Sequence, residues 1–172
     1  MDHLHEVKRL LTQVNCSAIG KVVNLLRRWR DSGEVVWVAG NGGSAANAVH
    51  FTAHMRERGL RAVSLCDNVP LLTAKANDLG YEKCFSEALP RGQPKSTELV
   101  VVFSCSGRSP NIVNLLDRAK AHGCVTVGFY GSEDSPVAEL TDFRLEFPSL
   151  NAGAVAAVHS AVVPTISQAL QC

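Results

Sequence analysis

The sequence has very little net charge. Its 17 lysine and arginine residues are balanced by 16 aspartate and glutamate residues, which leaves a formal charge of +1. Such a chain creates no field that would attract DNA or an anionic lipid surface. Aromatic residues make up only 6% of the chain, and neither Trp29 nor Trp37 belongs to a basic and aromatic stripe. We therefore expect no nucleic-acid partner.

The sequence also lacks the long apolar run that a membrane-spanning helix needs, so no membrane partner is expected. Its first residues, MDHLHEVKRLL, carry charge where a signal peptide would need an apolar core, which predicts a cytoplasmic protein. No C-x-x-C pair occurs among the cysteines, and their neighbours are mostly apolar, which favours buried free thiols over disulfides or a zinc knot. The six cysteines are Cys16, Cys66, Cys84, Cys105, Cys124 and Cys172.

The chain contains enough hydrophobic residues to form a core. Hydrophobic residues make up 46% of its 172 positions, and it contains no internal repeat or linker, so we expect a single domain over residues 1–172. Helical spacing of apolar residues over 4–29 predicts one or two amphipathic helices, with a break at 15–17. Five short apolar runs of β type follow, mostly separated by segments that can be helical: 35–39, 62–65, 99–103, 125–130 and 143–147.

Near-continuous apolar strands that alternate with helices predict an α/β fold. We expect a three-layer, doubly wound, five-stranded parallel sheet with right-handed crossovers. The helical segment 1–31 would extend an α/β core over 32–172. Ligands of such sheets bind beyond the C-terminal strand edge, where the winding direction reverses.

The most informative stretch is 35–54, VVWVAGNGGSAANAVHFTAH. An apolar run ends in the glycine-rich turn 40–44, and an Ala-rich helical pattern then begins. Glycines let the backbone approach a ligand, and the free N–H groups at a helix start favour a phosphate. His50 and His54 are four residues apart, so they share one helix face about two turns further in.

A second loop of this kind follows the predicted strand 99–103. It is serine-rich, and Ser109 is suited to cap the next helix, with Pro110 at its first position. The alternative is that these serines only cap and turn the chain. Two strand–loop–helix units of this type favour a ligand site.

Three catalytic or nucleotide-binding motifs are excluded. A cysteine-phosphatase loop needs an arginine six positions after its cysteine, whereas Arg108 comes three after Cys105. Neither glycine-rich turn ends in the Gly-Lys-Ser/Thr of nucleotide hydrolases. The dinucleotide fingerprint fails because Ala45 occupies the place of its third glycine.

Four motifs in order resemble the sugar isomerase (SIS) domain, and in particular its phosphoheptose isomerase branch. They are GNGGS at 40–44, HF at 50–51, DNVPLLTA at 67–74 with AND at 76–78, and S-x-SG-x-SPN at 104–111. The resemblance implies a flavodoxin-like strand order, a sugar-phosphate substrate and a homotetramer with sites between subunits, formed with the help of 1–31. It implies that the following residues bind the substrate, with a cysteine where the family commonly has threonine: Asn41, Gly42, Gly43, Ser44, Ser104, Cys105, Ser106 and Ser109.

The catalytic positions depart from this family. The resemblance implies a zinc site built from a histidine, a glutamate four residues later, and a glutamine and a histidine eight residues apart on a late helix. His50 matches the first position, His54 replaces the glutamate, and Ala156 and Pro164 take the last two places. Two ligands remain where a catalytic zinc usually has three, so we expect no metal ligands and no cofactor. A zinc ion bound with help from a neighbouring subunit is left open.

A shifted alignment would pair Asn151 with His159 and restore an amide and a histidine, but it needs a five-residue displacement. We expect His159 to be a helix residue with a satisfied hydrogen bond.

Aldose–ketose isomerisation needs a base beside the carbon alpha to the carbonyl and a donor for the carbonyl oxygen. Histidine can do either near neutral pH. We predict that His54 is the base and that His50 donates a hydrogen bond to the carbonyl oxygen or orients His54. The alternative is that both histidines serve only packing and capping. One of four carboxylates would support them: Asp78, or otherwise Asp67, Glu82 or Glu87.

Two functional classes follow. The first is an isomerase of a phosphorylated sugar of seven or eight carbons, in nucleotide-sugar or antibiotic-sugar assembly. The second is a non-catalytic SIS module that binds a sugar phosphate or acts as a protein adaptor. Loss of two family positions favours the module, whereas replacement of the glutamate by the titratable His54 favours the enzyme, which we predict.

Overall fold

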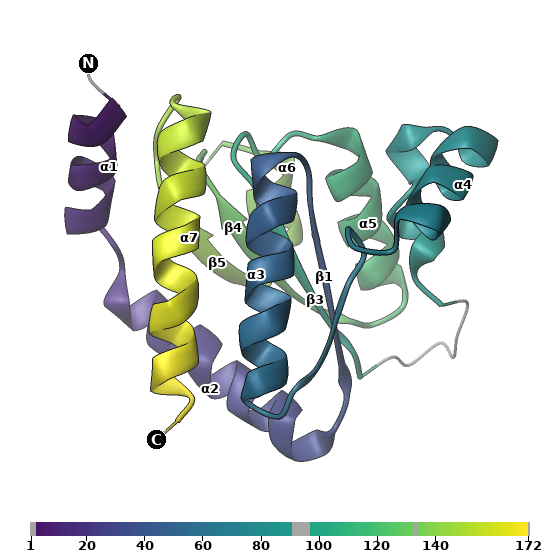
Figure 1. The fold of residues 1–172 in the computed structure, drawn as a ribbon, viewed down its shortest axis with the longest axis horizontal. Helices are drawn as coiled ribbons and strands as arrows, with labels where there is room; N and C mark the ends of the chain where they lie inside the picture. The colour runs from purple at the N-terminus through teal and green to yellow at the C-terminus, as the bar shows by residue number, and fades with distance from the viewer. Residues whose placement is uncertain (1–2, 91–96, 133, 172) are drawn as a thin grey trace.

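Five parallel strands form the centre of the protein (Figure 1). The computed structural model describes residues 3–90, 97–132 and 134–171, and in these the sheet order is β2-β1-β3-β4-β5. All four strand pairs are parallel. The strands are β1 (Val35–Gly40), β2 (Arg61–Ser64), β3 (Leu99–Ser104), β4 (Val125–Tyr130) and β5 (Phe143–Glu146). The predicted sheet is confirmed, and every predicted strand boundary lies within one residue of the observed one.

Helices cover both faces of this sheet, as the three-layer prediction requires. Helices α2, α3 and α7 pack on one face, while α5, α6 and the region around two 3₁₀ turns pack on the other. The described helices are α1 (His3–Thr12), α2 (Cys16–Ser32), α3 (Gly43–Glu57), α4 (Val69–Leu79), α5 (Pro110–Ala121), α6 (Pro136–Leu140) and α7 (Ala152–Ala169), with 3₁₀ turns η1 (Tyr81–Lys83) and η2 (Ser86–Ala88).

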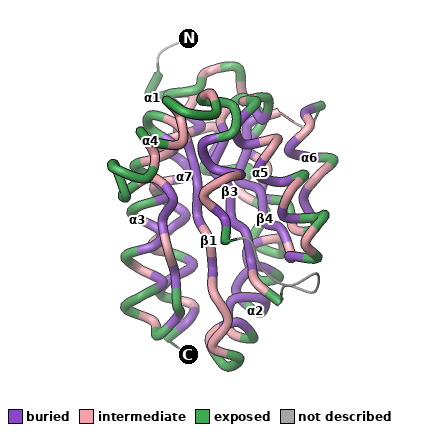
Figure 2. The backbone as a smooth tube through the Cα atoms, turned by 90° about the vertical axis from the view of Figure 1, so that its right-hand side faces the viewer, coloured by how far each residue is buried: buried purple, intermediate pink, exposed green. Residues whose placement is uncertain are grey.

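The central strand β3 is buried along its whole length (Figure 2). Val101 and Phe103 belong to the apolar cluster beneath α2, α3 and α7, whereas Val100 and Val102 belong to the cluster on the opposite face. A strand covered on both faces needs apolar side chains at every position. This requirement explains the continuous run LVVVF in the sequence.

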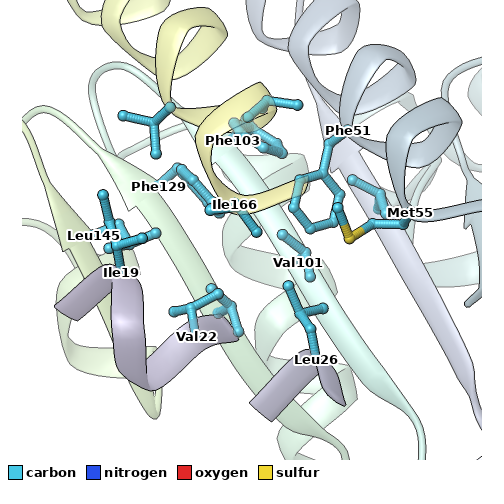
Figure 3. Close-up of a cluster of buried hydrophobic side chains, with 14 of the residues drawn as sticks. Ile19, Val22, Leu26, Phe51, Met55, Val101, Phe103, Phe129, Leu145 and Ile166 are labelled. Carbon is cyan, nitrogen blue, oxygen red and sulfur yellow. The ribbon is translucent and has the colours of Figure 1, made fainter. Parts of the chain in front are cut away.

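Aromatic packing fixes α3 on the sheet (Figure 3). Phe103 and Phe129 stack with their ring centroids 4.3 Å apart, and Phe51 of α3 meets both rings edge-on at 5.8 and 6.0 Å. Edge-to-face and stacked rings add to the free energy gained by burial. Because Phe51 points into this cluster, the rotation of α3 about its axis is set.

The N-terminal segment is a pair of helices. Asn15 directly precedes α2, and its side chain accepts a hydrogen bond from the Ala18 amide at 3.0 Å. The predicted break is therefore confirmed at Asn15, which is the N-cap of α2, but Cys16 and Ser17 already belong to the helix. The role of this pair in assembly stays a prediction.

The C-terminal end of α7 is held by arginines. Arg27 donates to the carbonyl of Ala169 at 2.7 Å, and Arg30 donates to that of Leu170 at 3.0 Å. Cations at this end also complement the helix dipole.

The cysteines are less uniformly buried than predicted. The five described ones are free thiols, but Cys16 is exposed, because it begins α2 at the surface, and Cys66 and Cys105 are half-buried. Cys84 and Cys124 are buried as expected, and Cys172 lies outside the described residues. None of the helices in the described part of the chain is long and apolar enough to cross a bilayer.

Candidate active site

A cavity of about 390 Å³ lies at the carboxyl ends of β1 and β3. These strands are neighbours at the point where the sheet order reverses, which is where doubly wound sheets bind ligands. Seven of the eight predicted substrate-binding residues line it; Gly42 is not among them. The lining residues are Asn41, Gly43, Ser44, Phe103, Ser104, Cys105, Ser106, Ser109, Ala152, Gly153 and Ala156. Helix α7 contributes the last three of these residues. The resemblance placed Ala156 at a site position, whereas no local pattern indicates Ala152 or Gly153.

The first loop brings the start of α3 directly over the end of β1. A Cβ at Gly40 would collide with the carbonyl of Ser44, so only glycine permits this approach. Gly42 precedes the helix with a φ of 53° and accepts hydrogen bonds from the Ala45 and Ala46 amides. Ser44 therefore stands in the first helical turn, where free N–H groups favour an anion.

The second loop is shaped by its own serines. The Ser104 hydroxyl accepts a hydrogen bond from the Gly107 amide at 3.1 Å, and the Ser106 hydroxyl accepts one from the Arg108 amide at 3.3 Å. Ser109 occupies the predicted N-cap position of α5, but its side chain makes no capping hydrogen bond. Ser109 therefore lines the cavity, and its hydroxyl is not used to cap the helix.

Side-chain contacts join the two loops. The Ser44 hydroxyl and the Cys105 thiol are 3.4 Å apart. Asn41 exchanges two amide hydrogen bonds with Asn111, and the Tyr81 hydroxyl donates to the same Asn41 oxygen at 2.9 Å. The predicted ligand residue Asn41 is therefore already held by protein partners. Asn111 belongs to the SPN motif, but no local pattern indicates that it pairs with Asn41.

The predicted histidine pair is formed on α3. The Nε2 atoms of His50 and His54 are 3.0 Å apart, and Nδ1 of His54 lies 3.6 Å from the Glu57 carboxylate. Burial, and secondly the charge of His54, lower the pKa of His50 below its usual value. Neither ring lines the cavity. The helical rise places His50 about 9 Å beyond Ser44 along the axis.

The expected supporting carboxylate lies elsewhere. Asp78 is exposed on α4, where it accepts a hydrogen bond from Asn77. Helix α4 packs on the α5 face of the sheet, opposite α3. The carboxylate beside the pair is Glu57, which its spacing of three residues from His54 could have indicated.

The donor set does not fit a catalytic zinc ion. Helices α3 and α7 run parallel in register, because Asn47 donates to the Ala156 carbonyl at 2.9 Å and Arg58 donates to the Ser167 carbonyl at 3.0 Å, both pairs 109 residues apart. The facing helix α7 has Ala156 and Pro164 at the family's ligand positions, and neither side chain is a donor. Within the described residues, no group of three His, Cys, Asp or Glu could hold a metal. Two imidazoles fall short of the three protein ligands that a catalytic zinc ion usually has.

His159 differs from its prediction. It is fully buried, and neither ring nitrogen has a hydrogen-bond partner among the described residues. Its ring instead meets Phe103, Phe129 and Phe147 edge-on at 5.7, 5.9 and 5.0 Å. Burial lowers its pKa to about 3, so the ring is neutral. The prediction of a satisfied hydrogen bond is wrong, because α7 turns this residue into the aromatic cluster.

Known proteins share both sequence and architecture with the chain. A family model described as SIS domain matches residues 2–131. The phosphoheptose isomerase of Burkholderia pseudomallei is 42% identical over 123 residues, 68% of this chain; the match spans only 62% of that relative. The phosphoheptose isomerase of Geotalea daltonii is 34% identical over 98% of this chain and 91% of its own length.

Solved structures show the same fold. A phosphoheptose isomerase from Neisseria gonorrhoeae has a TM-score of 0.88 at 24% identity, covering 98% of this chain and 95% of its own. One from Francisella tularensis has a TM-score of 0.86 at 22% identity, covering 98% and 92%.

Proposed function

The chain belongs to the SIS domain family, in its phosphoheptose isomerase-like branch, and on this premise we propose that it is an aldose–ketose isomerase of a phosphorylated seven- or eight-carbon sugar. The observation that carries the proposal is the cavity at the switch point of the sheet, walled by two helix starts and their serines. The relatives named phosphoheptose isomerase support the substrate class.

The phosphate of the substrate would occupy the serine-lined end of the cavity. Ser44 lies in the first turn of α3, and Ser109 at the N-cap of α5, so both helix dipoles favour a dianion there. Ser104 and Ser106 use their oxygens as acceptors within the loop, and each hydroxyl hydrogen can still point to a phosphate oxygen.

The histidine pair would transfer the proton. In this proposal Nε2 of His54 removes the proton alpha to the carbonyl and returns it to the adjacent carbon, while neutral His50 donates to the carbonyl oxygen. The two Nε2 atoms meet at 3.0 Å, so both tips reach the same point although their backbones differ by one helical turn. Glu57 would orient His54.

The substrate must be long enough to connect these two parts. The separation of about 9 Å between Ser44 and His50 along α3 is comparable with an extended seven-carbon chain. This length favours a higher sugar over a triose or tetrose phosphate.

The proposal also includes the assembly and the location of the protein. We propose a cytoplasmic homotetramer with sites between subunits, in the assembly of a nucleotide sugar or antibiotic sugar. Asp78 lies on the opposite face of the sheet from His54 in one chain, so its proposed role requires that a neighbouring copy supply it.

Proton NMR in heavy water tests the proposal. Sedoheptulose 7-phosphate and an octulose 8-phosphate would be incubated with the protein, and deuterium alpha to the carbonyl, or accumulating aldose, is the expected result. His54→Gln should preserve the fold and abolish exchange. Unchanged exchange in this variant would remove His54 from the mechanism.

One observation favours the second candidate, a non-catalytic module that binds sugar phosphates. The histidine pair does not line the cavity of the isolated chain. Saturable binding of both sugar phosphates without any deuterium incorporation would support the module.

A further inference from the structure

A second, smaller cavity adjoins the substrate cavity. It has a volume of about 190 Å³ and shares Cys105, Ser106 and Ala152 with the larger one. Its other walls bring in Arg108 and Ser132, which the proposed isomerase site does not use. We propose that this side cavity binds a second anionic group, a phosphate ester or a carboxylate, of the sugar phosphate held in the main cavity. The inference rests on the proposed function, which it extends to a doubly anionic substrate.

Arg108 supplies the positive charge. Its Nη2 atom donates to the backbone carbonyl of Asp134 and lies 3.5 Å from the Asp134 carboxylate. That carboxylate is fully exposed, so solvent screens the pair and leaves the guanidinium weakly compensated. Nε and Nη1 have no hydrogen-bond partner in the described part of the chain. The N–H groups of Nε and Nη1 are therefore available to a phosphate or carboxylate oxygen.

Ser106 forms the partition between the two cavities. Its hydroxyl accepts from the Arg108 amide of the side cavity, while its one hydrogen is assigned to the phosphate in the main cavity. Because Ser106 lines both cavities, one ligand can occupy them together.

The floor of the side cavity is rigid. Gly131, directly after β4, donates to the Cys105 carbonyl at 3.1 Å and accepts from the Ser149 amide at 3.0 Å. These bonds tie together the segments that follow β3, β4 and β5. A Cβ at Gly131 would lie 2.5 Å from the Cys105 carbonyl oxygen and 2.9 Å from a methyl group of Val155 on α7, so the segments after β3 and β4 approach more closely than a side chain would allow. Arg108 and Ser106 therefore project from a fixed frame.

A second carboxylate near the side cavity, that of Glu6, is neutralised by Arg9. Glu6 of α1 accepts from Ser149 at 2.5 Å, and Arg9 donates to both of its oxygens at 2.7 and 2.9 Å. Arg9 also donates to the Pro148 carbonyl at 2.7 Å. The carboxylate is paired with a cation, so it does not repel an anion in the side cavity.

The inference can be tested with three six-carbon ligands that differ in the number of their anionic groups. Fructose 6-phosphate has one anionic group, whereas fructose 1,6-bisphosphate and 6-phosphogluconate add a phosphate and a carboxylate at the other end. Calorimetric titration of the wild-type protein should show at least tenfold tighter binding of one or both doubly anionic ligands. The tighter of the two identifies the preferred group.

Arg108→Gln should abolish this preference while fructose 6-phosphate keeps its affinity within about twofold. Arg28→Gln is the matched control, because Arg28 is exposed on α2 and the change in net charge is identical. Thermal unfolding would confirm that both variants fold. If Arg28→Gln also lost the preference for doubly anionic ligands, the preference would depend only on the net charge of the protein, and the inference would be overturned.

Two other results would also overturn it. Equal binding of all three ligands by the wild type would show that no second anion site exists. Equal weakening of all three by Arg108→Gln would assign Arg108 to the first phosphate. If neither the sugar phosphates nor inorganic phosphate binds, the proposed function itself fails, and the inference fails with it.

Discussion

Asn41 and Asn111 exchange two amide hydrogen bonds, of 2.8 and 2.9 Å, although they lie 70 residues apart in the sequence. Asn41 follows β1 and Asn111 lies in the first turn of α5, after β3. The pair therefore holds the two cavity-lining loops at a fixed separation, and the Tyr81 hydroxyl also bonds Asn41. The proposed sugar-phosphate site depends on this separation, because in the proposal the phosphate touches both loops at once.

Breaking the amide pair should weaken both folding and ligand binding. Asn111 is only 2% exposed, so Asn111→Ala leaves the Asn41 amide without its partner, at a cost of roughly 1–3 kcal/mol in the free energy of unfolding. A double-mutant cycle with Asn41→Ala, followed by urea denaturation, should give a coupling energy of about 0.5–3 kcal/mol. Asn77→Ala is the control, because its amide bonds Asp78 at the surface. Additive effects of the two substitutions would contradict the pairing.

Glycine at position 40 should be required for the first loop. Gly40→Ala forces a Cβ against the Ser44 carbonyl, so the start of α3 must shift and the affinity for inorganic phosphate should fall at least tenfold. Gly20→Ala is the opposite case, since a Cβ there meets nothing within 4 Å in the middle of α2. It should stabilise the protein by roughly 0.5–1 kcal/mol. Phosphate titration and thermal unfolding of both variants check these outcomes, and an unchanged affinity in Gly40→Ala would contradict the steric argument.

His159 should make the protein sensitive to acid. Its pKa is about 3 in the folded state and 6.5 in the unfolded chain, so the unfolded state binds a proton first as the pH falls. The contribution of the neutral ring is complete above about pH 6.5 and is lost as the pH falls toward 3. Between pH 8 and 5 the loss should be about 2 kcal/mol.

His159→Leu removes this titration. The difference in unfolding free energy between wild type and variant, measured by denaturant titration at several pH values, should therefore shift in favour of the variant as the pH falls. Near pH 8 the variant should be about as stable as the wild type, because no hydrogen bond to the ring is lost. Parallel pH profiles of the two proteins would show that His159 is solvated.

The histidine pair predicts a spectroscopic result that does not depend on turnover. Burial and the charge of His54 lower the pKa of His50, so its ring should remain neutral to a pH below 6.5. His54→Gln removes the second cause, and the His50 midpoint should then rise toward 6.5. NMR titration of the ring protons checks this, and a midpoint that does not move would show that the two rings are not in contact.

Much of the architecture could be predicted from local patterns. Strands buried on both faces appear as continuous apolar runs, and the glycine and serine turns that follow β1 and β3 indicate the two loops that line the cavity. The seven individual residues of the cavity wall were predicted from the resemblance to the SIS domain, whereas the local pattern indicated only the loops in which they lie.

Sequence by itself determined the parallel sheet, its switch point and the placing of His50 and His54 on one face of α3. The sheet follows from the repeated strand–helix pattern, and the histidine pair follows from a spacing of four residues within one helix. Tertiary structure alone decided that α7 closes the cavity, that Asn41 meets Asn111, that Glu57 rather than Asp78 lies beside His54, and that His159 faces three phenylalanines. Helical and strand periodicity fixes which face of an element is apolar. It does not fix which polar groups of distant elements meet, because that depends on how the crossovers place α3, α4 and α7 against the sheet.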